Sequence, residues 1–169
     1  MAENQTSQEC LTMVAHLLTK GYFQYRHLNE AHLLAEYLAQ ACPNPRLATV
    51  GIKEILLNAI EHGNLGITSD EKAALQQQGI WIEEIERRLK LPEHIDQIVK
   101  VEFTRFPTEI HIKVIDEGSG FNWQNEINGD LCATHGRGLF IAKNLSFKRL
   151  DYSAKGNEVT CVIDLYTSN

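Results

Sequence analysis

The sequence predicts an α+β domain, because helical and strand-like patterns occupy different halves of the chain. Residues 46–62 are apolar around most of a helical circumference, as a largely buried helix is. In the second half, apolar and polar residues alternate at 99–104 and 110–114, which is typical of an antiparallel hairpin with one buried face. With 169 residues, of which 43% are hydrophobic and 22% charged, the chain can form one domain with a substantial core.

Before the central helix, the sequence predicts a strand and a helix. Tyr22–Arg26 is rich in aromatic residues and is typical of a strand. Asn29 is a candidate N-cap for a helix that runs to about Ala41, where two prolines prevent its extension. The central helix follows, and we expect it to end at Gly63 because glycine favours the helix C-terminus.

After the central helix, the pattern predicts two short helices and then strands. Ser69 or Asp70 can cap the first of these helices, which we expect to break at Gln78-Gly79. Helical spacing resumes from Trp81 to about Leu89. The hairpin at 99–114 follows, and two further strands are expected near 148–152 and 159–165.

Composition excludes several classes of protein. The net charge of −6 argues against a nucleic-acid binder, which normally carries a basic patch or stripe. The sequence has no run of 18 apolar residues and no signal peptide, so we expect a cytoplasmic protein with no membrane partner. The four cysteines are far apart and form no C-x-x-C pair, which predicts reduced thiols rather than a zinc site.

The central helix carries polar residues on one stripe of an otherwise apolar surface. Glu54 and Asn58 are four residues apart, and either Glu61 or His62 extends the same stripe. A buried carboxylate and amide are unfavourable unless something pairs with them. A metal ion bound to a ligand would be such a partner, because hard cations take oxygen ligands. The stripe therefore predicts an active-site helix that faces a metal-bearing ligand, although His62 could equally serve the helix end.

A second polar feature follows the hairpin. Asp116 lies on the same side of its strand as Ile112 and Val114, so a carboxylate ends the row of residues that face the core. Gly118 and Gly120 come next and would let the backbone approach a ligand closely. A turn aspartate with turn glycines is the simpler alternative.

Three motifs together resemble a known superfamily. E-x-x-x-N-A at 54–59, D-x-G-x-G at 116–120 and G-x-G-L at 136–139 resemble, in this order, the nucleotide-binding boxes of the GHKL ATPases. Within that superfamily, E-x-x-x-N-A-x-x-H-G resembles the bacterial anti-sigma-factor serine kinases used in partner switching. The segment N-A-I-E-H-G-N-L-G-I is most similar to ATP-binding domains found with response regulators or phosphatases. The resemblance covers the chain from about Gly21 onward.

The resemblance implies a role for each matching position. Glu54 would be the general base, and Asn58 the Mg²⁺ ligand that joins the metal to the phosphates of ATP. Asp116 would accept a hydrogen bond from the adenine amino group. The G-x-G-L motif would end a mobile ATP lid, with Arg137 as a charge partner for phosphate. The residues implied at the nucleotide are Glu54, Asn58, Glu61, His62, Asp116, Gly118, Gly120, Phe121, His135, Gly136, Arg137, Gly138, Leu139 and Asn157. Of these, His135 would contact phosphate or only precede a helix, and Asn157 would hold a water near adenine.

The resemblance also implies the topology. We expect an α/β two-layer sandwich of the Bergerat type, in which a mixed, mostly antiparallel sheet carries helices on one face and ATP lies between the helices and the lid. Residues 1–20 would form a tail or short element, and 21–169 a single ATP-binding domain with a helical insert at about 68–92. In the insert, Trp81 would be a packing anchor and the charges of 83–88 a solvated face or a docking surface for a partner.

Three classes of function remain open from the sequence. The first is a Mg-ATP-dependent serine/threonine kinase that phosphorylates a small protein of the anti-sigma-factor antagonist type, or sequesters a sigma factor or response-regulator protein. The second is a non-catalytic nucleotide-gated binding module, and the third is a histidine-kinase-type catalytic domain or a gyrase-type ATPase. The presence of Glu54 favours the first class, because binding alone does not need a base. Whether the chain forms a homodimer stays open.

Overall fold

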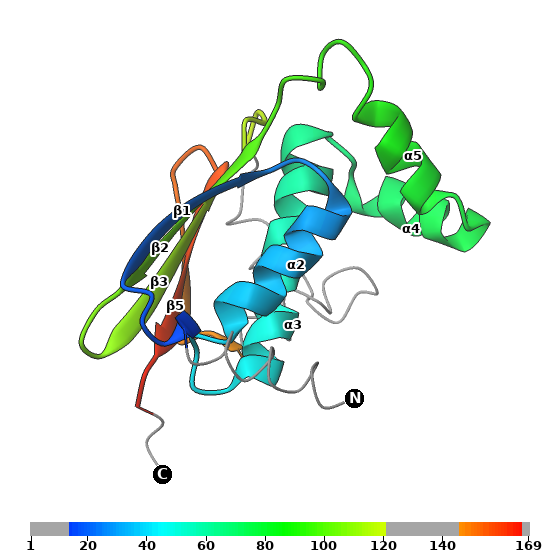
Figure 1. Cartoon of the computed structure of the whole chain (residues 1–169). Helices are drawn as coiled ribbons and strands as arrows, with labels where there is room; N and C mark the ends of the chain where they lie inside the picture. The colour runs from blue at the N-terminus through cyan, green and yellow to red at the C-terminus, as the bar shows by residue number, and fades with distance from the viewer. Residues whose placement is uncertain (1–13, 121–145, 167–169) are drawn as a thin grey trace.

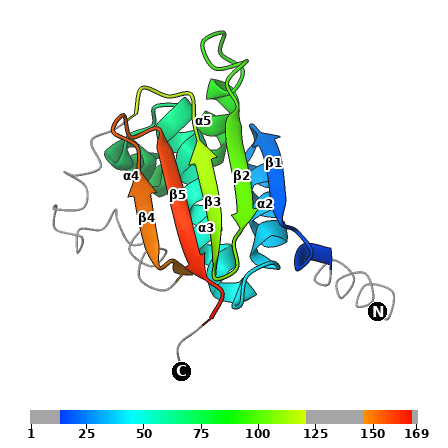
Figure 2. The same cartoon turned by 90° about the vertical axis from the view of Figure 1, so that its left-hand side faces the viewer.

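The computed structural model describes residues 14–120 and 146–166 of the chain, as two layers. One layer is a sheet and the other consists of helices packed on one of its faces (Figures 1 and 2). The elements in chain order are β1 (Lys20–Tyr25), α2 (Leu28–Ala39), α3 (Pro45–Asn58), the π-helical turn η1 (Ala59–Asn64), α4 (Ser69–Gln78), α5 (Trp81–Arg88), β2 (Val99–Arg105), β3 (Glu109–Ile115), β4 (Arg149–Tyr152) and β5 (Glu158–Asp164). This arrangement confirms the predicted α/β sandwich.

The sheet has five strands in the order β1-β2-β3-β5-β4 (Figure 2). All four pairings among the described strands are antiparallel, so the prediction of a mixed sheet is wrong for the part of the chain that the structure describes. The predicted hairpin is present, with Val101 opposite Val114 in β2 and β3. Its alternating apolar residues are buried against the helices, which is why a shift in register of one residue would expose the whole set.

The N-cap of α2 lies two residues before the predicted cap at Asn29. The Glu30 carboxylate accepts hydrogen bonds from the backbone N–H groups of Arg26 and His27, each at 2.9 Å. His27 is therefore the N-cap residue. A glutamate at the third helical position can satisfy the free N–H groups of the first turn, and this favours the earlier start.

The central helix consists of α3 and η1. Asn44 caps its N-terminus by accepting a hydrogen bond from the Leu47 N–H at 3.2 Å, and Pro45 occupies the first position of the helix. The prediction that Gly63 ends the helix is wrong, because Gly63 has no positive φ and lies inside η1. The π turn carries the helix through Asn64, and the left-handed glycine is Gly66, with φ of 61°.

Helices α4 and α5 lie where the sequence predicts the insert, beside one end of α3 and η1 (Figure 1). The Thr68 hydroxyl, rather than Ser69 or Asp70, caps α4 by accepting from the Glu71 N–H at 3.2 Å. Gly79, with φ of 73°, ends α4, which confirms the predicted break at Gln78-Gly79. In the described part of the chain, no helix is long and apolar enough to span a bilayer.

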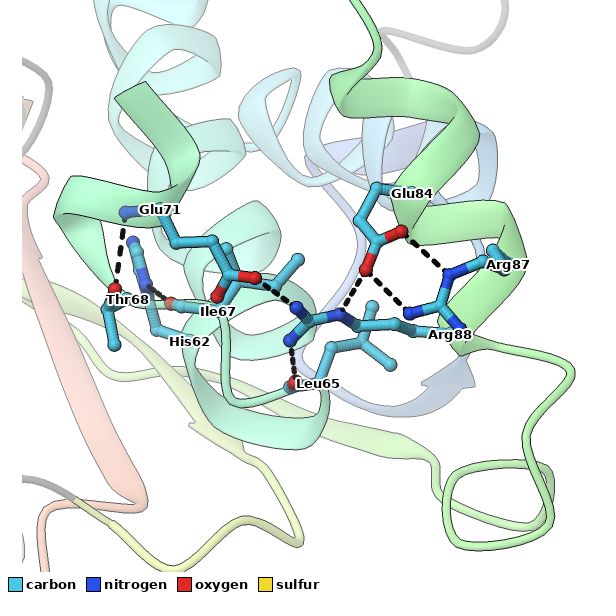
Figure 3. Close-up of polar contacts among 8 residues, drawn as sticks. All are labelled: His62, Leu65, Ile67, Thr68, Glu71, Glu84, Arg87 and Arg88. Atoms are coloured by element: carbon cyan, nitrogen blue, oxygen red, sulfur yellow. Dashed lines mark hydrogen bonds and ion pairs between the residues drawn. The ribbon is translucent and has the colours of Figure 1, made fainter. Parts of the chain in front are cut away.

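Arg88 joins the insert to the rest of the domain (Figure 3). Its guanidinium donates to the Leu65 carbonyl at 3.0 Å and to Glu84 at 2.7 Å, and it also binds the Glu71 carboxylate. Because Leu65 follows η1, Glu71 lies on α4 and Glu84 lies on α5, one side chain fixes three segments to one another.

Candidate functional site

A cavity of about 650 Å³ lies between the central helix, α4 and the strands β3, β4 and β5. Its lining combines apolar side chains such as Ile55 and Val159 with polar and charged side chains from the helices and the sheet. A concave site with a few convergent polar groups is the usual form of a small-molecule site. The described residues that line it are Glu54, Ile55, Asn58, Ala59, His62, Gly63, Gly66, Ile67, Thr68, Ser69, Lys72, Ala73, Gln76, Val114, Asp116, Ser119, Gly120, Tyr152, Gly156, Glu158 and Val159.

Glu54 and Asn58 both line this cavity from one face of α3. The Asn58 side-chain nitrogen donates to a Glu54 carboxylate oxygen at 3.4 Å. With its nitrogen turned toward Glu54, Asn58 keeps its amide oxygen available to another group. The predicted stripe therefore presents a carboxylate and an amide oxygen side by side.

Asp116 lies at the end of β3 and also lines the cavity. Asp116 and Asn157 are joined through both backbone groups of Asp116: its N–H donates to the Asn157 carbonyl at 3.0 Å, and its carbonyl accepts from the Asn157 side chain at 3.1 Å. Its carboxylate accepts from the Gly118 N–H at 2.9 Å. The Asn157 side chain thus supports the backbone of Asp116 and is not part of the cavity wall.

Burial raises the pKa of the Asp116 carboxyl from 3.8 to about 6, and the hydrogen bond from Gly118 opposes this shift. A pKa that is higher in the folded state favours folding of the protonated form. This contribution to stability is fully present below pH 3.8 and is lost as the pH rises through about 6. At neutral pH the fold therefore holds an ionised carboxylate in an unfavourable place, as a residue kept for ligand binding often is.

Glycines allow Asp116 to lie against the central helix. A Cβ atom added to Gly63 would lie 2.7 Å from the Cβ atom of Asp116 and closer still to its carboxyl carbon, and one added to Gly118 would lie 2.7 Å from the Gly63 carbonyl carbon. Gly120 has φ of 81° and packs on the backbone of Lys155. Gly118 and Gly120 therefore allow close approach to the backbone of Gly63 and Lys155, while their predicted approach to a ligand stays a prediction. Gly63 has the same role in place of the predicted helix cap.

The two candidates that follow Asn58 lie on different sides of the helix. His62 lines the cavity, and its Nδ1 contacts the Ile67 carbonyl (Figure 3). Because a carbonyl can only accept, Nδ1 carries a proton in this contact. Glu61 is fully buried and is not among the cavity-lining residues; its carboxylate lies 2.5 Å from the Lys72 ammonium.

Sequence reasoning missed the contribution of α4 to this site. Thr68, Ser69, Lys72 and Gln76 line the cavity from one face of this helix. The segment has almost no apolar pattern from which a buried face could be predicted, and none of its residues is classed as buried. The only sequence signal was its position directly after the central helix.

The remaining predicted residues lie outside the described part of the chain. They are Phe121, His135, Gly136, Arg137, Gly138 and Leu139. Their predicted roles in the lid and in phosphate binding stay predictions. Of the four cysteines, Cys42 and Cys161 are described, and both are free thiols in the core.

The described residues suit a metal that is shared with a ligand. Among them, no three His, Cys, Asp or Glu side chains cluster in a way that could hold a metal ion. Mg²⁺ is commonly held by one or two protein oxygens together with phosphate oxygens and water. The amide oxygen of Asn58, which lines the cavity, fits such a partial donor set.

A comparison with protein-family models decides the family. The model of the histidine kinase-like ATPase domain matches residues 25–163, which is most of the chain. The chain belongs to the histidine kinase-like ATPase family. A search of curated proteins gave no match. Membership in this family implies that the domain binds ATP, and the cavity beside Glu54, Asn58 and Asp116 is the place in the described structure where these predicted residues meet.

Proposed function

We propose that this histidine kinase-like ATPase is a Mg-ATP-dependent serine/threonine protein kinase of the anti-sigma-factor type. Its substrate would be a small protein of the anti-sigma-factor antagonist type, and a sigma factor or response-regulator protein would be the partner that it sequesters. The observation that carries the proposal is the Glu54 carboxylate, which lines the cavity 3.4 Å from the Asn58 amide nitrogen. A nucleotide-binding site that serves only as a switch does not need a base at this place.

Each residue has a separate task in the proposed reaction. The Asp116 carboxylate accepts a hydrogen bond from the adenine amino group and fixes the base end of ATP. The Asn58 amide oxygen would hold Mg²⁺, which when bound neutralises charge on the β- and γ-phosphates. Glu54 orients the hydroxyl of the partner and takes its proton as the hydroxyl oxygen attacks the γ-phosphorus and ADP leaves. Because phosphoryl transfer depends mainly on positioning and electrostatics, small displacements of these groups should slow it strongly.

The second candidate is a non-catalytic nucleotide-gated binding module. Ile80 and Ile82 on the insert are large apolar side chains with exposed fractions of 44% and 56%. Large apolar side chains on the surface can bury area against a protein partner. In this case ATP would change the affinity for a partner without phosphate transfer.

The test is transfer of labelled phosphate from Mg-ATP to a panel of purified anti-sigma-factor antagonist proteins from the source organism. We expect acid-stable phosphoserine or phosphothreonine in one of them. Glu54→Gln should lower the rate by at least about 100-fold, as expected for the loss of a general base, while calorimetry shows unchanged ATP binding.

The outcomes separate the candidates. An acid-labile phosphate on histidine would support the histidine-kinase alternative and overturn the proposal. ATP binding with no transfer to any protein of the panel would favour the binding module. Equal transfer rates for the wild type and Glu54→Gln would remove the role of Glu54 as base.

A further inference from the structure

Lys72 extends from the insert into the cavity. The residues of α4 and its cap that line the cavity recur at 68–69, 72–73 and 76, which is the spacing of one helix face. The side chain of Lys72 is 21% exposed, and its ammonium lies 2.5 Å from the fully buried carboxylate of Glu61. It also lies 5.8 Å from the centre of the Trp81 ring. These contacts hold the ammonium on the cavity wall.

The charge of the described wall makes this ammonium unusual. Glu54, Asp116 and Glu158 supply carboxylates, and Lys72 is the one lysine or arginine among the described lining residues. Glu158 has its own partner, since it lies 3.0 Å from the Lys113 ammonium. A polyphosphate that binds beside several carboxylates needs a positively charged group to offset their repulsion.

Neighbouring charges indicate which end of the cavity Lys72 serves. The Lys72 ammonium is bound to Glu61, which follows Asn58 by three residues on the central helix. At the other end of the cavity, the Lys155 ammonium donates to the Gly118 carbonyl at 3.0 Å, in the loop of Asp116. Lys72 is thus associated with the Asn58 end, where the phosphates would lie, and Lys155 with the Asp116 end.

An ammonium has three donors, and Glu61 does not use all of them. We propose that Lys72 binds the phosphate groups of the nucleotide, and that the helical insert is therefore part of the nucleotide site rather than an appendage. Glu61 is a positioning residue that keeps the ammonium at the wall. This inference rests on the nucleotide-binding part of the proposed function and not on phosphate transfer.

The test must avoid leaving a buried charge alone. Lys72→Met would leave the buried Glu61 carboxylate without its ion-pair partner, and removing one partner of a buried ion pair is strongly destabilising. The useful comparison is therefore between Glu61→Gln, which keeps Lys72, and the double variant Glu61→Gln/Lys72→Met. The matched control is Glu61→Gln/Lys90→Met, because Lys90 is exposed and outside the cavity while the change in net charge is the same.

Calorimetric titration with adenosine, ADP and ATP in the presence of Mg²⁺ gives the readout, after circular dichroism melts have shown that the variants are folded. The double variant with Lys72→Met should bind ADP and ATP about tenfold more weakly than Glu61→Gln, as expected for one charged hydrogen bond. Its affinity for adenosine and the affinities of the Lys90 control should be unchanged. Unchanged ADP and ATP affinities, or an equal loss for adenosine, would overturn the assignment.

This experiment distinguishes the two proposals. If the variants behave as expected but no partner is phosphorylated, the kinase proposal fails and the role of Lys72 stands. If phosphate is transferred and the Lys72 variant binds ATP like its parent, the kinase proposal stands and the role of Lys72 fails. Absence of nucleotide binding by the wild type would overturn both.

Discussion

Gly63→Ala tests whether contact between the central helix and the Asp116 loop builds the base end of the site. The new Cβ would lie 2.7 Å from the Cβ atom of Asp116 and closer still to its carboxyl carbon, against about 3.5–4.0 Å for carbon atoms in favourable contact. The two groups must therefore separate by roughly 1 Å. Asp116 cannot move freely, because its backbone is bound to Asn157 on both sides.

The magnitude follows from two opposing effects. Overpacking costs about 1–3 kcal/mol, whereas replacing glycine by alanine inside a helix stabilises it by about 0.5–1 kcal/mol. The net expectation is a loss of up to about 2.5 kcal/mol, or up to roughly 10 °C in Tm for a domain of this size. Displacement of the Asp116 carboxylate should also lower ADP affinity at least about tenfold, since a hydrogen bond to a charged group contributes about 1.5–3 kcal/mol.

Thermal melts and calorimetric titration with ADP measure both effects. Gly79→Ala is the matched control: Gly79 ends α4 with φ of 73°, and no atom lies within 4 Å of an added Cβ. It should lower Tm through backbone strain and leave ADP affinity unchanged. If Gly63→Ala instead raises Tm and binds ADP like the wild type, the proposed contact does not shape the site.

Four further predictions follow from the same structure. Relative to the wild type, Asp116→Asn should be more stabilising at pH 8 than at pH 4, because the raised pKa makes the ionised carboxyl unfavourable above about pH 6. Thermal melts of both proteins at the two pH values measure this difference, and an equal effect at both would contradict it. The wild type should lose ADP affinity as the pH falls below about 6, whereas Asp116→Asn should show no such loss. Arg88→Met should lower the free energy of unfolding, measured by denaturant titration, by about 1–3 kcal/mol, and it should speed amide exchange in α4 and α5. Arg87→Met, at an exposed residue, should change the free energy of unfolding by less than about 0.5 kcal/mol. Tyr25→Phe, which removes the 2.6 Å hydrogen bond to the Leu56 carbonyl, should cost about 1 kcal/mol, and an unchanged midpoint in urea would refute this value.

The strands could be predicted from the sequence because their information is local. Alternation at 99–104 and 110–114 fixes which face of β2 and β3 is buried, and it also places Asp116 at the end of the core-facing row. The Glu54–Asn58 pair could be predicted for the same reason, since two residues that are four positions apart lie on the same face of a helix. The pairing order of the strands, β1-β2-β3-β5-β4, was not predicted.

The parts that could not be predicted depend on contacts between distant segments. Gly63 has the local signature of a helix end, and only the position of Asp116, more than fifty residues later, shows that its missing side chain makes room. Similarly, α4 has a polar sequence that is consistent with full exposure. Its role in the cavity arises because Arg88 holds it against the end of the central helix.

The π-helical turn is a place where the central helix can gain or lose a residue. Glu54 and Asn58 precede it, whereas Gly63, which contacts Asp116, lies within it. Hydrogen bonds in a π turn join residues five apart, so the turn takes up one residue more than an α-helix over the same arc. Deleting one residue of 59–62 would therefore restore α-helical winding while the segments on either side keep nearly the same relative orientation. The contact of Gly63 with Asp116 and the face that carries Glu54 and Asn58 would stay at the same cavity.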